Sequence, residues 1–150
     1  MKFPVHIPFI DKLGVEFLAS EVGSAELALT TTEDLCNSWG VMHGGVVMTL
    51  LDVAMAQAAR TPAPAGSPAQ ARGGSSGMVT VEMKTSFMRP GQGRLLAKGR
   101  VLHRSASMVF CEATIVDAES QLVAHATGTF KTLRGLPAGG RRIMRPDASD

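Results

Sequence analysis

The feature that most constrains this chain is residues 44–60, a run of helix-forming residues that is apolar on nearly every side. It contains no proline, and its polar side chains before Arg60 are Thr49, Asp52 and Gln57. A helix without a polar face has no side to turn to water, so it must be buried. The rest of the chain must therefore cover this helix.

The segments around the helix alternate apolar and polar residues, which is typical of β-strands with one buried face. Glycine, proline and polar residues separate these segments at turn positions. The order of two strands, a helix and four strands predicts an α+β fold, in which one antiparallel sheet of about six strands curls around one helix. The predicted strands are residues 13–22, 24–31, 78–88, 94–103, 107–117 and 121–133.

Three other segments complete the predicted organisation. Residues 4–11 begin with a proline and are expected to form a short helical turn. Residues 61–77 are rich in Pro, Ala, Gly and Ser, so we expect a flexible loop there. Residues 135–150 are expected to form a flexible C-terminal tail, which leaves residues 1–134 as a single domain.

Composition argues against several classes of function. The formal net charge is +2 and the basic residues are scattered except near the C-terminus, so no nucleic-acid partner is expected. No apolar run approaches the roughly 20 residues of a membrane span. The two cysteines, Cys36 and Cys111, lack the spacing of a disulfide framework, which favours the cytoplasm. No His or Cys pair has the spacing of metal ligands, so no metal is predicted.

Residues 37–52 contain a group of side chains suited to chemistry. Gly44 and Gly45 open the helix, where unpaired backbone N–H groups and the helix dipole suit a carbonyl oxygen or an anion. Asp52 lies in the middle of the apolar helix, and a buried carboxylate without a partner costs several kcal/mol, roughly, so it is rarely accidental. Asn37 and His43 flank the helix entrance with groups that form hydrogen bonds.

These features suit attack on a thioester, which needs a polarised carbonyl, a site for the oxyanion and a base or nucleophile. We expect the Gly44 N–H to polarise the carbonyl, and Asp52 to activate water or to attack directly and form an anhydride. Structural roles stay open for three residues: Asp52 paired with a buried arginine or capping a neighbouring loop, His43 bonded to the backbone at the helix start, and Asn37 in a turn.

The spacing of Gly44 and Asp52 has a geometric consequence. Eight residues of α-helix span about 12 Å, so one thioester carbon does not reach both groups on a single helix. If both act, they come from different subunits, with two such helices running antiparallel across a dimer axis. The sequence therefore predicts a site shared across an obligate homodimer.

The loop and the helix together resemble the hotdog-fold thioesterases of the phenylacetate-pathway (PaaI) type. The resemblance is carried by the sequence His-Gly-Gly, with an asparagine six residues before it and an aspartate seven residues after the second glycine. Residues 77–91, GMVTVEMKTSFMRPG, are similar to the strand that follows the helix in that family, and the order of elements matches over residues 13–133. The motif residues are Asn37, His43, Gly44, Gly45 and Asp52.

The resemblance implies a hotdog fold, an acyl-CoA substrate, no cofactor, and a dimer with two sites that pairs into a tetramer. It implies that Gly44 supplies the oxyanion N–H, that Asn37 orients water or the carbonyl, and that Asp52 is the base or nucleophile. A hydroxyl on the next strand assists in such enzymes, and that position falls on Thr80. An ordinary strand threonine bonded to a neighbour is the alternative for Thr80.

Coenzyme A carries phosphates, so a basic group is expected near the mouth of the pocket. We favour Arg104 with Ser105 and Ser107 at a tight turn, and place Gly45 among the substrate-binding residues. Met42 or Met48 is a candidate to line the acyl pocket. The other basic candidates are Arg89, Arg72, Arg141 and Arg142.

The sequence thus predicts hydrolysis of an acyl-CoA to a free acid and coenzyme A. One alternative is an acyl-CoA-binding protein of the same fold without catalysis. Another is a hotdog hydratase or dehydratase that uses His43 with Asp52 to move protons. The acyl group, and the choice between coenzyme A and a carrier protein, stay open.

Overall fold

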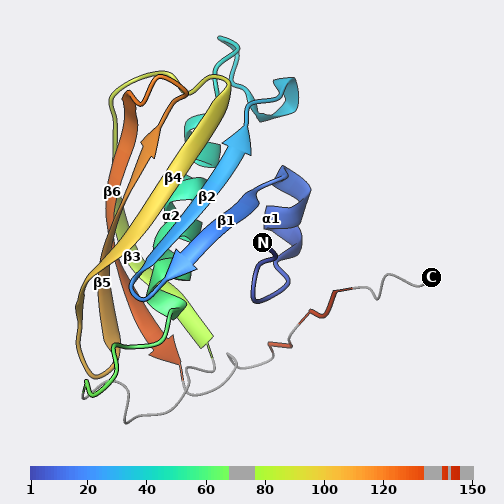
Figure 1. The fold of residues 1–150 in the computed structure, drawn as a ribbon. Helices are drawn as coiled ribbons and strands as arrows, with labels where there is room; N and C mark the ends of the chain where they lie inside the picture. The colour runs from blue at the N-terminus through green and yellow to red at the C-terminus, as the bar shows by residue number, and fades with distance from the viewer. Residues whose placement is uncertain (68–76, 134–139, 142, 146–150) are drawn as a thin grey trace.

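The computed structural model describes residues 1–67, 77–133, 140–141 and 143–145 (Figure 1). The chain forms one long helix and a six-stranded sheet, preceded by a short helix. The elements are α1 (Pro8–Leu13), β1 (Glu16–Glu21), β2 (Ser24–Thr30), the 3-10 turn η1 (Glu33–Leu35), α2 (Gly44–Arg60), β3 (Gly77–Phe87), β4 (Arg94–Arg104), β5 (Met108–Val116) and β6 (Leu122–Leu133).

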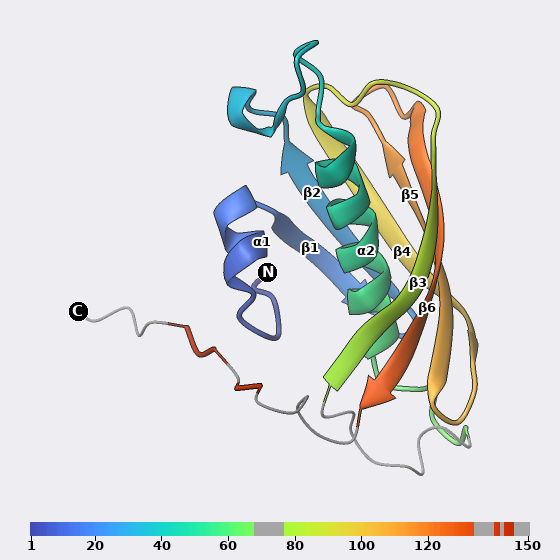
Figure 2. The ribbon, with the colours of Figure 1, turned by 180° about the vertical axis from the view of Figure 1, so that it is seen from behind.

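The sheet has the strand order β1-β2-β4-β5-β6-β3, and every neighbouring pair is antiparallel. The sheet curves, and α2 lies along its inner face (Figures 1 and 2). This arrangement confirms the predicted α+β fold, and α2 has the bounds predicted from its apolar run.

Close packing of α2 against the sheet depends on a glycine in β4. A Cβ atom on Gly99 would lie 2.3 Å from the backbone oxygen of Ala54, so only glycine lets the strand approach the helix so closely. The helix side chains that face the sheet are fully buried, and each contributes roughly 1.5–3 kcal/mol for a large apolar group. They include Leu50, Leu51, Ala54, Met55 and Ala58, which pack with Leu27, Leu95, Ile115 and Phe130 of the strands.

One stripe of α2 departs from the expected burial on every side. Met48 is 38% exposed, and Asp52, Ala56 and Arg60 follow at four-residue intervals with half-buried side chains. Residue types alone do not say which element covers a helix, and among the described elements no strand covers this stripe. Its four residues line a cavity together with residues of α1 and β3, two elements that flank α2 on opposite sides (Figure 2).

The N-terminal boundaries also differ from the prediction. The first helix occupies Pro8–Leu13 instead of residues 4–11, because Pro8 suits the first turn of a helix. Gly14 ends that helix in the left-handed conformation, with φ of 77°, so strand β1 begins at Glu16. Residues 32–43, which connect β2 to α2, contain η1, and the remaining strands lie within about two residues of their predicted bounds.

Parts of two predicted segments lie outside the described residues. In the predicted loop at 61–77, residues 61–67 contain no helix or strand, and 68–76 are not described. Most of the predicted tail at 135–150 is also outside the described part. Among the residues that the structure describes, no helix is long and apolar enough to cross a membrane.

Candidate active site

Asp52 and Thr80 meet where α2 passes β3. The Thr80 hydroxyl donates a hydrogen bond of 2.8 Å to Oδ1 of Asp52. Fold and sequence thus bring together the two side chains that the resemblance pairs, although they are 28 residues apart. Thr80 lies on an edge strand whose outward positions are exposed, so the pair is held at the boundary of the chain and not deep in its core.

The Asp52 carboxyl opens into a cavity of about 480 Å³. Its lining residues come from α1 and the residue before it, from α2 and from β3. Figure 2 shows α1 and β3 on either side of α2. Most of the lining is apolar, which suits the acyl part of a thioester. The apolar lining consists of Ile7, Phe9, Ile10, Met48, Val53, Ala56, Met78 and Met83.

Burial raises the pKa of Asp52 above its ordinary value, and the hydrogen bond from Thr80 opposes this shift without cancelling it. Desolvation has this effect because a low-dielectric surrounding disfavours the charged carboxylate. A carboxylate with a raised pKa is a stronger base, and perturbed carboxyls in clefts are candidates for catalytic groups. Asp52 is therefore a candidate for a catalytic base.

The N-terminus of α2 is capped by its own flanking histidine. The ring Nδ1 of His43 accepts a hydrogen bond of 2.9 Å from the Gly45 N–H, and the His43 carbonyl accepts from Val46 and Val47. His43 therefore has the structural role that the sequence left open. This cap occupies the Gly45 N–H, so it is not available to a ligand.

The Gly44 N–H is different, because it has no acceptor in the part of the chain that the structure describes. Its backbone lies beside the ring of Phe87, and a Cβ atom built on Gly44 would be 3.5 Å from that ring. An unpaired amide at the start of a helix is a donor for an oxyanion. The oxyanion role of Gly44 stays a prediction, with its N–H free of an acceptor among the described residues.

Asn37 shapes the loop before α2. Its Oδ1 accepts hydrogen bonds from the backbone N–H groups of Trp39, at 2.9 Å, and Val41, at 3.4 Å. These bonds are those of a turn residue, which was the structural alternative for Asn37. Within the described chain its side chain does not contact Asp52. The Trp39 side chain in this turn is 84% exposed.

Gly44 and Asp52 do not meet within one chain. They lie on one uninterrupted helix, Gly44–Arg60, so the expected separation of about 12 Å along its axis holds. The structure therefore brings Asp52 and Thr80 together and leaves Gly44 at a distance.

Arg104 has a role that the sequence analysis missed. Its guanidinium donates to the carbonyl oxygens of Ala59, at 2.9 Å, and Thr61, at 3.0 Å, and more weakly to that of Ala58. A guanidinium at this position satisfies carbonyls left without partners at the end of the helix and complements its dipole. Arg104 therefore caps the C-terminus of α2, at the opposite end from Gly44.

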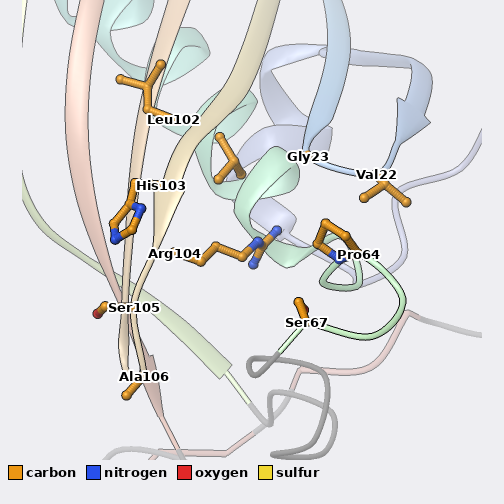
Figure 3. Close-up of a pocket in the computed structure, with 10 residues that line it drawn as sticks. Val22, Gly23, Pro64, Ser67, Leu102, His103, Arg104, Ser105 and Ala106 are labelled. Carbon is orange, nitrogen blue, oxygen red and sulfur yellow. The ribbon is translucent and has the colours of Figure 1, made fainter.

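The turn beside Arg104 borders a second cavity, of about 620 Å³ (Figure 3). Figure 3 shows the Arg104 side chain extending toward the end of the helix, with Pro64 beyond it. Ser105 Oγ accepts from the Met108 N–H, at 3.2 Å, and the Ser107 carbonyl accepts from Thr132, so both serines form the turn between β4 and β5.

The other basic candidates have different positions. Arg89 donates to the Leu122 carbonyl at 2.9 Å, and Arg141 is exposed. Arg72 and Arg142 lie outside the described residues.

Comparison with known proteins decides the family. Residues 40–124 match the profile of the thioesterase superfamily. The chain belongs to this superfamily. Membership confirms the predicted class of enzyme, a thioester hydrolase.

Two relatives in the superfamily cover most of the chain. The medium/long-chain acyl-CoA thioesterase YigI of Salmonella typhimurium is 30% identical over 135 residues, which is 85% of this chain and 87% of YigI. A protein of Saccharolobus solfataricus assigned as an esterase is 31% identical over 123 residues, which is 81% of this chain and 75% of that protein.

Solved structures support the same fold. A mutant of the phenylacetic acid degradation protein PaaI from Thermus thermophilus superposes with a TM-score of 0.72 and 28% identity, over 85% of this chain and 100% of that one. The PaaI protein of E. coli superposes with a TM-score of 0.73 and 24% identity over 85% of each chain, a likeness of fold. The predicted resemblance to hotdog thioesterases of the PaaI type is confirmed.

Proposed function

We propose that this superfamily member hydrolyses an acyl-CoA to the free acid and coenzyme A, with Asp52 as the catalytic carboxylate. The observation that carries the proposal is the Asp52–Thr80 pair, which opens into an apolar cavity of about 480 Å³. The raised pKa of Asp52 and the acyl-CoA thioesterase activity named for a 30% identical relative support it.

In the general-base route, Asp52 takes a proton from a water molecule and the water oxygen attacks the thioester carbon. The C–S bond breaks, and the sulfur leaves as the coenzyme A thiol after it receives the proton. Thr80 holds Oδ1 through its hydrogen bond and leaves Oδ2 to face the water. In the covalent route, the carboxylate attacks the carbon itself and water then cleaves the anhydride. Neither route needs a cofactor.

We propose that the oxyanion is bound by the Gly44 N–H of a second copy of the chain. The half-buried stripe of α2 lies next to β3, an edge strand of 11 residues with exposed apolar side chains. An exposed edge strand offers unpaired backbone groups to another chain. Val81 and Phe87 on this strand are 53% and 54% exposed. A homodimer through this face would bring a second helix near Asp52, and pairing of two dimers remains part of the proposal.

The coenzyme A nucleotide is proposed to contact the turn at Ser105 and Ser107. Arg104, the last residue of β4 before this turn, joins the turn to the end of α2 through its hydrogen bonds. Both cysteines are free, which is consistent with the proposed location in the cytoplasm. The hydratase alternative gains no support within one chain, because His43 Nδ1 is bonded to the Gly45 N–H and His43 lies about half the length of α2 from Asp52.

The shared site is tested by mixing two inactive variants. Asp52→Asn removes the base, and Gly44→Pro removes the N–H. Proline fits the first helical position, and His43, with φ of −60° and ψ of 137°, has the extended backbone that a residue before proline requires. Gly44→Ala is the matched control, since it retains the N–H and its Cβ would meet Phe87 at an ordinary contact distance.

Each variant alone is expected to release little thiol from a panel of acyl-CoAs. In a heterodimer of the two variants, one site combines the intact Gly44 of one chain with the intact Asp52 of the other, while the second site carries both defects. Each heterodimer in the mixture is therefore expected to have one active site out of its two. Asp52→Asn with activity near wild type would remove Asp52 from the mechanism, and mixing without recovery would contradict the shared site.

A further inference from the structure

Gln57 is the buried polar side chain of α2 that the catalytic proposal leaves without a role. It is 3% exposed, and the other buried polar residue among those described is Thr61, at 8%. The Thr61 hydroxyl accepts from the Gly23 N–H and donates to the Ala58 carbonyl. The Gln57 amide, in contrast, forms no hydrogen bond within the described part of the chain. Its nitrogen and oxygen keep access to the cavity, since neither is among the fully enclosed side-chain atoms without a partner.

The Gln57 side chain lines the same cavity as Asp52. Other hydroxyls in that lining are engaged, since Thr49 donates to the Gly45 carbonyl at 2.8 Å and Thr80 donates to Asp52. An amide that borders a cavity is bonded to water there, so a ligand that displaces this water must replace its bonds or leave the amide unpaired. An unpaired amide in a cavity wall is therefore a group that a ligand is expected to satisfy.

The position of Gln57 along α2 indicates which part of a substrate it would contact. It lies five residues after Asp52, about 7.5 Å further along the helix axis. It is buried, whereas Asp52 is half-buried, and it shares the cavity wall with apolar side chains of α1 and α2. The pantetheine arm of coenzyme A must lead from the thioester to solvent, so a buried group beyond the carboxylate faces the acyl chain.

We propose that Gln57 selects acyl chains that carry a hydroxyl group well beyond the thioester, an inference that rests on the proposed function. A primary amide offers both a donor and an acceptor, and a hydroxyl matches both at once. The apolar walls on either side, such as Ile10 and Met83, suit the methylene groups that lead to the hydroxyl. The substrate class is therefore a hydroxyacyl thioester with a distal hydroxyl.

The test compares matched acyl-CoAs of six, eight and ten carbons, each unsubstituted, with a terminal hydroxyl, or with a hydroxyl at carbon 3. The readout is kcat/KM from thiol release, for the wild type and for Gln57→Met. Methionine has nearly the same length as glutamine and already lines this pocket, so it keeps the volume and removes the amide. Thr49→Val is the matched control, because it alters a lining hydroxyl that is already paired within the helix.

We expect the wild type to favour the terminal hydroxyl over the unsubstituted chain by about tenfold at one of these lengths, as one hydrogen bond to a buried polar group allows. Gln57→Met is expected to reverse that preference and to melt no lower than the wild type. Thr49→Val is expected to keep the preference. A wild type that favours the unsubstituted chain at every length would overturn the inference.

An equal loss on all substrates in Gln57→Met would also overturn it, since that pattern indicates contact with the common pantetheine arm or a contact between subunits. Binding of non-hydrolysable thioether analogues, measured by calorimetry, separates this inference from the proposed function. If no thiol is released from any thioester, the proposed function fails. The ratio of the dissociation constants of the hydroxylated and the unsubstituted analogue still decides the role of Gln57.

Discussion

The two ends of helix α2 have opposite hydrogen-bonding states. At the C-terminal end, Arg104 and the Thr61 hydroxyl bond the last carbonyl groups. At the N-terminal end, His43 caps the Gly45 N–H, while the Gly44 N–H has no acceptor within the described residues. Unpaired polar groups are costly, so the donor left without an acceptor at the N-terminal end is a candidate to bind a ligand. The contrast distinguishes residues that stabilise the ends of the helix from the residue that we propose to act in the reaction.

The largest expected effect comes from removing the unpaired N–H at the N-terminal end of α2. Gly44→Pro removes one oxyanion donor, and loss of such a donor typically lowers kcat by about 10²–10³. Thermal unfolding is expected to change little, because proline is tolerated at the first position of a helix. Steady-state kinetics of Gly44→Pro beside Gly44→Ala measures the difference. Equal activities for the two variants would show that the N–H has no part in the reaction.

The next effect concerns the paired end. Arg104→Met leaves helix carbonyls without their charged donor and is expected to lower the free energy of unfolding by about 2 kcal/mol, with kcat almost unchanged. Urea denaturation measures this loss. Arg94→Met is the control, since Arg94 forms an exposed pair with Glu16 and surface pairs contribute little.

The same variant separates capping from phosphate binding. If Arg104 also contacts the nucleotide, its replacement raises KM for acyl-CoAs but not for N-acetylcysteamine thioesters, which lack phosphate. An unchanged KM with both substrate types would restrict Arg104 to capping.

A smaller effect is expected at the cap itself. His43→Ala removes the acceptor for the Gly45 N–H and is expected to cost about 1 kcal/mol of stability, which His43→Ser restores as a good capping residue. Activity is expected to follow stability in both variants. A hundredfold loss of kcat in both, at unchanged stability, would instead make His43 a catalytic group.

The smallest expected effect is a shift in pH dependence. Burial raises the pKa of Asp52, so the acid limb of kcat/KM should lie above the range of an ordinary carboxyl, with activity lost as pH falls through that pKa. The Thr80 hydrogen bond lowers the same pKa, so Thr80→Val should move the limb to higher pH and leave the alkaline plateau nearly intact. Thr85→Val on the same strand is the control. A limb that stays in place would separate Thr80 from the ionisation of Asp52.

The linkage to stability has the opposite sign from that of a salt-bridged carboxylate. A raised pKa means that the folded state disfavours the charged form, so the cost is present above the folded pKa and vanishes as pH falls below the unfolded value. Asp52→Asn should therefore be most stabilising above the folded pKa of Asp52, and urea denaturation at several pH values measures this.

Local pattern was enough to predict much of this molecule. The bounds of α2 follow from an apolar run with glycines at its start, and the strands follow from alternation. Asp52 could be identified as a candidate because a carboxylate buried in an apolar helix without a partner is energetically costly. The sequence left a structural and a functional role open for each of His43 and Asn37. The structural role could be foreseen in both cases, because it consists of bonds to backbone groups within four residues.

Tertiary structure decided the rest, because the remaining contacts join distant parts of the chain. Arg104 reaches the Ala59 carbonyl across 45 residues, and no periodicity reports such a pairing. The wall that α1 builds over the cavity, and the unpaired amide of Gln57 beneath it, depend on how helices pack and not on their residue types. By itself the sequence determined which residues carry reactive groups and which segments are regular. Packing in three dimensions decided which of those groups are paired and which stay open to a substrate.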